Sequence, residues 1–334
     1  MYRDRRSAFA ALTAAGLLWG TTVPLSKLSL GWLPPAWLTF VRFGLASAVL
    51  LPAARAQLRS AFRPAVLASG AAGYGGSVLV QNVGIARTSV SHAALLIGAV
   101  PVLIAIIAAL WHRTVARPLA WAGFAVSLAG VGLITGSKGG GATATGDGIV
   151  LASLLLSATF TVAQARLLRG RDPAAVTAVQ FLGAALGALP LAITTQAFPA
   201  APAGPGTVLA VAALAIGGTL VPFTFFAYGQ SRVPAEVAGA FVNLEPLVGA
   251  LAGVVIFGNP FGQVQVIGGA GILAGIAMSG LPAMRRPPAR FSGSARAGGL
   301  QRRLARQPDR PCLPSLEPDD LESALMPAGG HVIR

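Results

Sequence analysis

The sequence predicts an all-α integral membrane protein of ten transmembrane helices, arranged as two inverted repeats of five helices each. Charged residues make up only 10% of the chain, and its mean hydropathy is +0.70, whereas a soluble domain carries about 25% charged residues. The two halves of the chain also match each other in order, and basic residues gather between alternate apolar runs. Together these observations favour a multi-pass helical bundle.

Ten apolar runs are long enough to cross a bilayer, because a transmembrane helix needs about 20 predominantly apolar residues. The connections between the runs are short and rich in proline, glycine and arginine, which is typical of loops. The predicted spans are 8–27, 36–53, 65–85, 92–111, 118–136, 148–168, 174–193, 207–228, 236–257 and 262–282.

The second half of the chain repeats the first at an offset of 145 residues. Matched positions include Gly84 with Gly229, Arg87 with Arg232, Pro101 with Pro246, and Leu128-Ala129-Gly130 with Leu273-Ala274-Gly275. Many carriers are built from such repeats and hold their substrate at the repeat interface. We therefore predict a cytoplasmic N-terminus over 1–7, a first repeat over 8–136, a second repeat over 148–282 and a C-terminal tail over 285–334.

The basic residues predict that both termini are cytoplasmic, because cytoplasmic loops of membrane proteins carry an excess of Lys and Arg. With the N-terminus inside, only Lys27, Arg87 and Lys138 fall outside. The inside segments then hold Arg3, Arg5, Arg6, Arg55, Arg59, Arg63, Arg113, Arg117, Arg166, Arg169, Arg171 and Arg232. Five spans per half is an odd number, so the second half must be inverted relative to the first.

The tail over 285–334 is rich in arginine and proline and poor in large apolar residues, which predicts a disordered cytoplasmic segment. It is either a solvated extension without a role or a segment attracted to anionic lipid headgroups.

Glu245 is the sharpest candidate for a functional side chain, because ionisable groups within a span are costly and rare. It lies about nine residues into the span 236–257, a depth of about 13 Å at 1.5 Å per residue. Pro246 follows it and removes a backbone donor, which frees carbonyls beside the carboxylate. Glu245 is either a proton- or cation-sensitive binding group in a central cavity, or a neutral or ion-paired carboxyl that holds helices together.

Arg42 is the complementary candidate, in the second span. It either snorkels towards the membrane surface, pairs with Glu245, or holds an anionic group of the substrate. Its partner in the second repeat is Gln180, so both halves place a polar group at this depth.

Asn82, Asn243 and Trp19 complete the set of candidate substrate-binding residues. Amides within spans often serve only as hydrogen bonds between helices. Trp19 lies at mid-span, whereas membrane tryptophans gather at the interfaces, so it either packs internally or lines a cavity.

Composition excludes several classes of function. The formal net charge of +15 suggests nucleic acid, but the arginines sit at span ends and in the tail rather than along one polar face. A single cysteine, Cys312, rules out an internal disulfide framework, and three distant histidines offer no metal spacing. The chain has no Walker loop, and we expect no cofactor.

Several segments resemble EamA-type carriers of the drug/metabolite transporter superfamily, over about residues 8–282. They are Trp19-Gly20, 38–43, 84–89, Tyr228-Gly229 and Asn243-Leu244-Glu245-Pro246. The resemblance implies ten spans, an inner-membrane location and solute export or exchange through a central cavity. Members often carry a glutamate just after the fourth and ninth spans, where this chain has His112 and Gly258.

The favoured function is therefore a secondary transporter, not an enzyme, that moves a small metabolite, amino acid or drug between the repeats. Protons are the candidate coupling ion, the lipid bilayer is the surrounding partner, and a homodimer is compatible with the sequence. A passive pore is the alternative. A membrane-embedded enzyme would need clustered acid, base or metal groups, and the spans offer only scattered single ones.

Overall fold

The computed structural model describes residues 2–111, 118–136, 141–202, 204–233, 235–259 and 262–284, and these residues form helices and loops without a strand. The predicted tail therefore lies outside the described residues. The helices are α1 (Tyr2–Trp19), α2 (Thr22–Ser29), α3 (Pro35–Ala53), α4 (Leu58–Ala61), α5 (Pro64–Ser69), η1 (Gly70–Gly76), α6 (Ser77–Ala86), α7 (Val90–Ile97), α8 (Val100–Trp111), α9 (Pro118–Gly136), α10 (Ala144–Leu167), α11 (Pro173–Thr195), α12 (Pro205–Ala215), η2 (Ile216–Leu220), α13 (Val221–Gln230), α14 (Ala235–Ala240), η3 (Phe241–Asn243), α15 (Leu244–Phe257) and α16 (Gln263–Met284).

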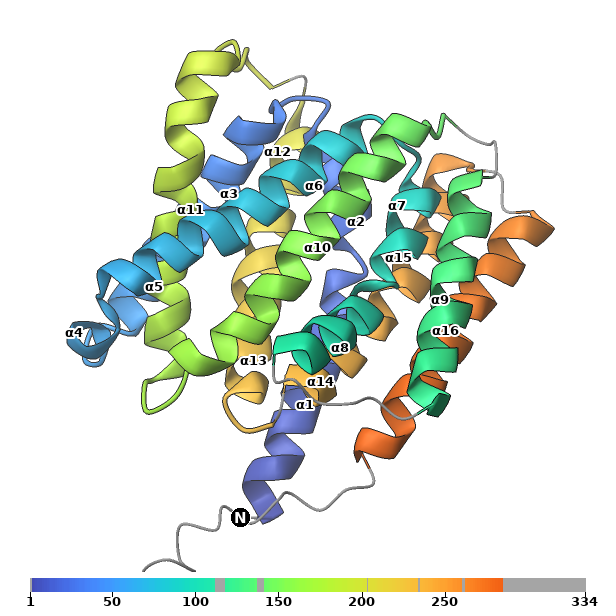
Figure 1. The fold of residues 1–334 in the computed structure, drawn as a ribbon. Helices are drawn as coiled ribbons and strands as arrows, with labels where there is room; N and C mark the ends of the chain where they lie inside the picture. Colours follow the sequence, from blue (N-terminus) through green and yellow to red (C-terminus); the bar gives the residue numbers. More distant parts are fainter. Residues whose placement is uncertain are drawn as a thin grey trace, which may run out of the picture. The chain divides into compact units, whose positions relative to one another are not determined.

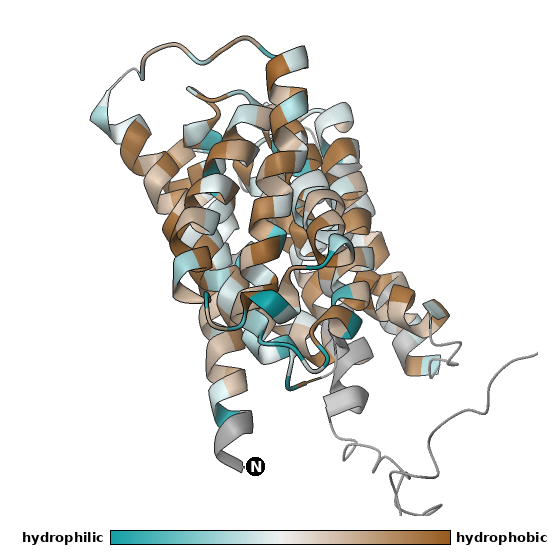
Figure 2. Cartoon of the chain, turned by 90° about the vertical axis from the view of Figure 1, so that its left-hand side faces the viewer, coloured by the Kyte–Doolittle hydropathy of each residue, from teal (hydrophilic) through white to brown (hydrophobic). Residues whose placement is uncertain are grey.

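Six described segments are long and apolar enough to span a membrane, which makes the chain a multi-pass membrane protein. They are Arg6–Ser29, Pro35–Ala53, Val90–Trp111, Ala144–Leu167, Pro173–Thr195 and Pro205–Gln230. The other four predicted spans, 65–85, 118–136, 236–257 and 262–282, are largely helical, and the last three contain shorter apolar helices. Hydrophilic residues gather mainly at helix ends and in loops, while the helix bodies are mostly apolar (Figure 2).

Several helices are interrupted, and the interruptions fall at matching places in the two halves. The π-helical segments η1 and η2 lie about 145 residues apart, the offset of the sequence repeat. The turn at 98–99 separates α7 from α8, and η3 separates α14 from α15 at nearly the same offset. π-helical turns often mark functional sites, and membrane helices tolerate broken backbone where it lines a cavity.

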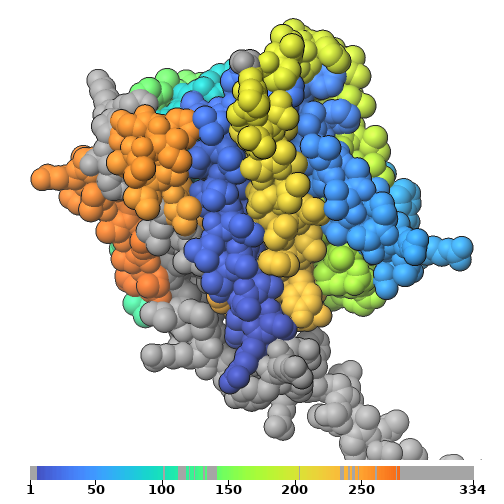
Figure 3. Space-filling view, turned by 180° about the vertical axis from the view of Figure 1, so that it is seen from behind, coloured from blue at the N-terminus to red at the C-terminus, as the bar shows by residue number. Residues whose placement is uncertain are grey.

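The helices of the first half pack against those of the second. The most extensive pair is α9 with α16, followed by α3 with α11, η1 with α11, α6 with α10, α7 with α15, and α1 with α13. These pairs are visible in Figure 1, and Figure 3 shows α1 and α2 running between the yellow helices α12–α13 and the orange α15–α16. Shifting α1 and α6 by 145 residues gives α10 and α13, so the pair α1–α13 corresponds to α10–α6.

Small residues allow the close approach of paired helices. A Cβ atom on Gly130 of α9 would lie 2.5 Å from the carbonyl oxygen of Gly268 in α16, so only glycine fits between these backbones. Figure 1 also shows that α1 begins and α16 finishes at the same end of the bundle.

Candidate functional site

A polar cavity of about 90 Å³ lies among helices from both halves of the chain. Eleven elements contribute to its wall, among them the interrupted segments η1–α6, α7–α8 and η3–α15. The lining residues are Trp19, Thr22, Arg42, Tyr74, Ser77, Val78, Gln81, Ile97, Val100, Ile104, Ser153, Leu154, Ser157, Phe160, Thr161, Gln164, Phe223, Phe226, Val242 and Glu245.

Arg42 reaches this cavity from α3 and is only 2% exposed, so its side chain does not snorkel to the surface. Its Nε donates to Thr219 Oγ1 at 2.8 Å, and one terminal nitrogen donates to the carbonyl of Gly218 at 3.3 Å. Both acceptors belong to η2. The Thr219 hydroxyl donates in turn to the Leu214 carbonyl, which leaves its oxygen free to accept from the guanidinium. The local break in the helix thus supplies the groups that hold Arg42.

Glu245 lies in the first turn of α15 and is 7% exposed. Because η3 interrupts the segment just before, the carboxylate sits at a helix N-terminus, where the partial positive charge favours an anion. Pro246 is tolerated there, since the first turn has no intrahelical donors to lose. The only hydrogen bond described for the carboxylate comes from the Thr22 hydroxyl, at 3.4 Å to Oε1. The single proton of that hydroxyl is shared with the Trp19 carbonyl, which lies closer, at 2.7 Å.

Arg42 and Glu245 attract each other across the cavity. Among the described residues, however, no nitrogen–oxygen distance of 4.0 Å or less joins them in an ion pair. The direct pairing considered from the sequence is therefore absent from this conformation, although both side chains line one cavity.

Trp19 ends α1 beside the carboxylate and lines the same cavity. Its ring packs against Phe223 and Phe226, each with ring centroids 5.0 Å away. The side chain is 9% exposed, and its Nε1 has no hydrogen-bond partner among the described residues. Trp19 therefore contributes its ring to the cavity wall, while its Nε1 is enclosed by the surrounding side chains.

A second polar pair in the lining joins η1 to α10. Tyr74 and Gln164 exchange hydrogen bonds, with Gln164 Nε2 at 2.9 Å from the phenol oxygen. Tyr74 also packs edge-on against Phe160 and Phe223, with centroids 4.7 Å apart in both pairs. These contacts form an aromatic cluster in the cavity wall.

The remaining predicted site residues lie elsewhere. Gln180 is buried in α11 and donates to Ser69 Oγ at 3.2 Å, and Asn82 is buried in α6 and donates to Thr39 Oγ1 at 3.1 Å. Neither is among the cavity's lining residues. The side chain of Asn243 lies outside the part of the chain whose side chains are described.

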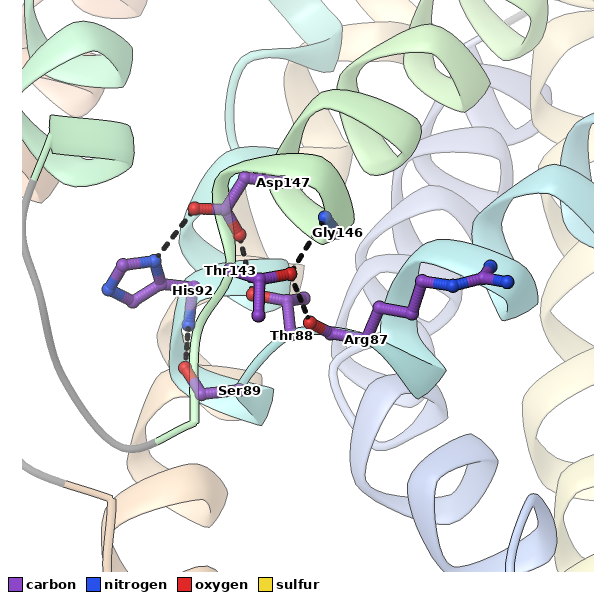
Figure 4. A network of polar contacts seen from close by, with 7 residues as sticks. All are labelled: Arg87, Thr88, Ser89, His92, Thr143, Gly146 and Asp147. Carbon is purple, nitrogen blue, oxygen red and sulfur yellow. Dashed lines mark hydrogen bonds and ion pairs between the residues drawn. The ribbon is translucent and has the colours of Figure 1, made fainter.

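A separate buried network joins the two halves where α7 and α10 begin (Figure 4). His92 Nδ1 lies 3.0 Å from Asp147 Oδ2, both side chains are 2% exposed, and Asp147 also accepts from the Thr88 hydroxyl. The Thr143 hydroxyl donates to the Arg87 carbonyl at 2.6 Å and accepts from the Gly146 amide. We call this the His92–Asp147 network. Its contacts hold the first turns of α7 and α10 together at one end of the bundle.

Sequence reasoning did not single out Tyr74, the cavity's phenylalanines or the His92–Asp147 network. Phenylalanines in an apolar run look the same whether they face lipid or a cavity, and Asp147 lies at a span end, where polar residues are ordinary. The one available signal was the helical spacing of Ser153, Ser157 and Thr161, which places three hydroxyls on one face of α10.

Comparison with known proteins agrees with this architecture. The profile of the EamA-like transporter family matches residues 6–136 and again 144–281. A stretch of 63 residues is 41% identical to an uncharacterized transporter of Archaeoglobus fulgidus, covering 19% of this chain and 23% of that protein, so the chain aligns with under a quarter of that relative's length. A solved crystal structure has the same fold with a TM-score of 0.65 and 27% identity, over 84% of this chain and 99% of that one.

Proposed function

Because the chain belongs to the EamA-like transporter family, we propose that it is a secondary carrier with its substrate site in the polar cavity. Membership of that family and a relative that is named a transporter support a membrane transporter, and both point to transport rather than to enzymatic catalysis. The carrier mechanism, the site and the orientation are our proposals. The observation that carries them is a cavity with a buried arginine and a buried glutamate, walled by residues of both halves.

The proposed architecture is ten spans in two inverted repeats, with both termini in the cytoplasm and the protein in the inner membrane. The family profile matches two consecutive segments of similar length, and the helix breaks recur at the repeat offset. Inverted repeats allow a carrier to open alternately to the two sides by rocking one half against the other. The common end of α1 and α16 agrees with two cytoplasmic termini.

Glu245 is the proposed coupling residue, with protons as the coupling ion. Its carboxylate faces the cavity and has one long hydrogen bond from the protein. Ionisable residues at such positions often form proton pathways in transporters. Substrate and proton would then compete for, or bind together at, the same group.

Solute counterflow tests the proposal and separates a carrier from a passive pore. The full-length protein is reconstituted into liposomes that contain excess unlabelled solute, with a trace of labelled solute outside, for a panel of amino acids, sugars and organic cations. A carrier accumulates the label transiently above its outside concentration, whereas a pore only equilibrates it. Downhill equilibration alone, for every solute that crosses, would contradict the carrier mechanism.

Glu245→Gln tests the coupling role in the same assay. The amide keeps a hydrogen-bonding group beside Thr22 but cannot titrate, so we expect a folded, inserted protein without counterflow or without its pH dependence. Normal counterflow at every pH would make Glu245 a structural residue. If the variant fails to fold, Arg42→Gln in the same background should partly restore stability, because it removes the charge left without its counterpart.

A further inference from the structure

The short helix α7 lies between the polar cavity and the end of the bundle where α7 and α10 begin. We call this end the outer end, because it is periplasmic in the proposed orientation. All eight residues of α7 are buried, whereas a helix at the surface of a bundle keeps one face outward. Its first turn belongs to the His92–Asp147 network, and its last residue, Ile97, lines the cavity. A solute that moves between the cavity and the outer end must therefore pass α7.

The junction between α6 and α7 meets α10 at very short distances. A Cβ atom on Gly146 of α10 would lie 2.5 Å from the carbonyl oxygen of Arg87. A Cβ atom on Gly84 of α6 would lie 2.8 Å from the amide nitrogen of Val150 in α10. Only glycine allows backbones to approach this closely, and no water fits between them. In this conformation the α6–α10 contact is therefore closed.

Polar side chains hold the α6–α7 junction from both halves of the chain. Lys27 of α2, in the same half, donates to the carbonyls of Ile85 and Thr88, at 2.8 Å each. Asn259, which follows α15 in the second half, has its amide oxygen turned towards α7. It accepts there from the first two backbone N–H groups of α7, at 3.2 Å each, which are donors that a helix N-terminus leaves without an intrahelical partner.

Asp147 supplies the side-chain contacts that join the two halves at the outer end (Figure 4). One of its carboxylate oxygens lies 3.0 Å from His92 Nδ1, and the other accepts from the Thr88 hydroxyl. Both partners belong to the first half and Asp147 to the second. Rocking of one half against the other separates such groups at the end that opens. The network therefore cannot persist in a state that is open at the outer end.

The sequence repeat places a corresponding contact at the opposite end, near the start of α1. The pair α1–α13 corresponds to α10–α6, and in it Ser7 Oγ lies 3.0 Å from the Tyr228 hydroxyl in an exposed contact. Hydrogen bonds are stronger in a buried, low-dielectric setting than in contact with water. The polar contacts of the outer end are therefore the stronger of the two sets in this conformation.

We propose that α7 and the α6–α7 junction form an outer gate, which the His92–Asp147 network holds closed and which opens only when that network breaks. The inference rests on the proposed function, because a gate of this kind serves a carrier that opens alternately to its two sides. It adds a specific consequence: weakening the network should open the outer end and leave the opposite end closed.

A reversible covalent link tests whether the network breaks during transport. In a Cys312→Ser background, Thr88→Cys is combined with Asp147→Cys, whose native side chains are in contact. Oxidation of the pair should abolish the counterflow of every amino acid, sugar or organic cation that the reduced protein transports, and reduction should restore it. Each single-cysteine variant is the control, and its counterflow should be the same before and after oxidation. Transport that continues with the disulfide in place would overturn the proposal.

Cysteine labelling tests the gate without any solute, so its result is independent of the carrier mechanism. Two buried reporters are compared in the Cys312→Ser background: Ala93→Cys in α7 and Leu12→Cys in the α1–α13 contact, both 0% exposed in the native protein. A charged maleimide is added to permeabilised membrane vesicles. Asp147→Asn removes the charge that His92 and Thr88 bind, and should speed the labelling of Ala93→Cys about tenfold while that of Leu12→Cys stays unchanged.

The outcomes of the labelling separate a gate from a general loss of stability. Asp172→Asn, at the first turn of α11, is the matched control and should change neither rate. If Asp147→Asn fails to fold, Thr88→Val removes one of the two contacts to the carboxylate and should still speed the labelling of Ala93→Cys several-fold. Equal acceleration at both reporters, or no acceleration at Ala93→Cys in a folded variant, would overturn the proposal.

Discussion

Replacing Asp147 with alanine should strongly destabilise the protein, because two buried partners lose their acceptor. His92 Nδ1 lies 3.0 Å from one carboxylate oxygen, and the Thr88 hydroxyl donates to the other. A hydrogen bond to a charged group contributes about 1.5–3 kcal/mol, and breaking a buried pair by removing one partner costs about 3–5 kcal/mol. Because Asp147, Thr88 and His92 are each 2% exposed or less, we expect a loss of about 3–5 kcal/mol.

Asp172 provides the matched control, because it is also an acid at a helix N-terminus. Its carboxylate accepts one hydrogen bond, from the Ala175 amide at 2.8 Å, and it is only partly buried. Removing such a capping residue costs about 1 kcal/mol. Thermal unfolding of both alanine variants in one detergent, followed by tryptophan fluorescence, should lower the Tm several times more for Asp147→Ala. An equal decrease would refute the view that the His92–Asp147 network fastens the halves together.

Two further predictions concern packing and orientation. Gly130→Ala should lower the free energy of unfolding by about 1–3 kcal/mol, because the new methyl group meets the Gly268 carbonyl and overpacks the α9–α16 contact. Gly132→Ala on the same helix meets open space and should not destabilise the protein. Equal Tm values for the two variants would contradict this. Reporter fusions after Gly141 and after Ala203 should report the periplasm and one after Arg171 the cytoplasm, and the reverse pattern would exclude the proposed orientation.

Hydropathy located the helices well, but it could not place their breaks. The run 65–85 reads as one span, yet the glycines between Gly70 and Gly76 allow a π-helical segment there. The break matters because the matching segment η2 holds Arg42 through Thr219 and Gly218. Such a contact depends on which helices become neighbours, and the spacing of residues within one span carries no information on that.

Polar residues in apolar runs were useful guides to the cavity, but depth alone did not identify its wall. Trp19, Arg42 and Glu245 come together in one space, whereas Gln180, at the depth of Arg42 in the other half, bonds to Ser69 between helices. The face of the helix decides between these outcomes. In a bundle of helices rich in small residues, most faces of a helix contact another helix. Apolar residues are therefore spread almost evenly around each helix axis, and their pattern does not reveal which face lines the cavity.

The most direct test is whether the cavity is open to water while an outward-facing position of α10 is not. Ser157 lines the cavity, and the neighbouring Leu156 is 46% exposed on the outside of the bundle. After Cys312→Ser removes the only native thiol, single cysteines are introduced at each position and treated with a charged maleimide in membrane vesicles. Reaction needs a hydrated thiolate, so Ser157→Cys should react, with protection by a solute that shows counterflow, and Leu156→Cys should not. Equal reactivity of the two, or reaction only at position 156, would contradict a substrate path through this cavity.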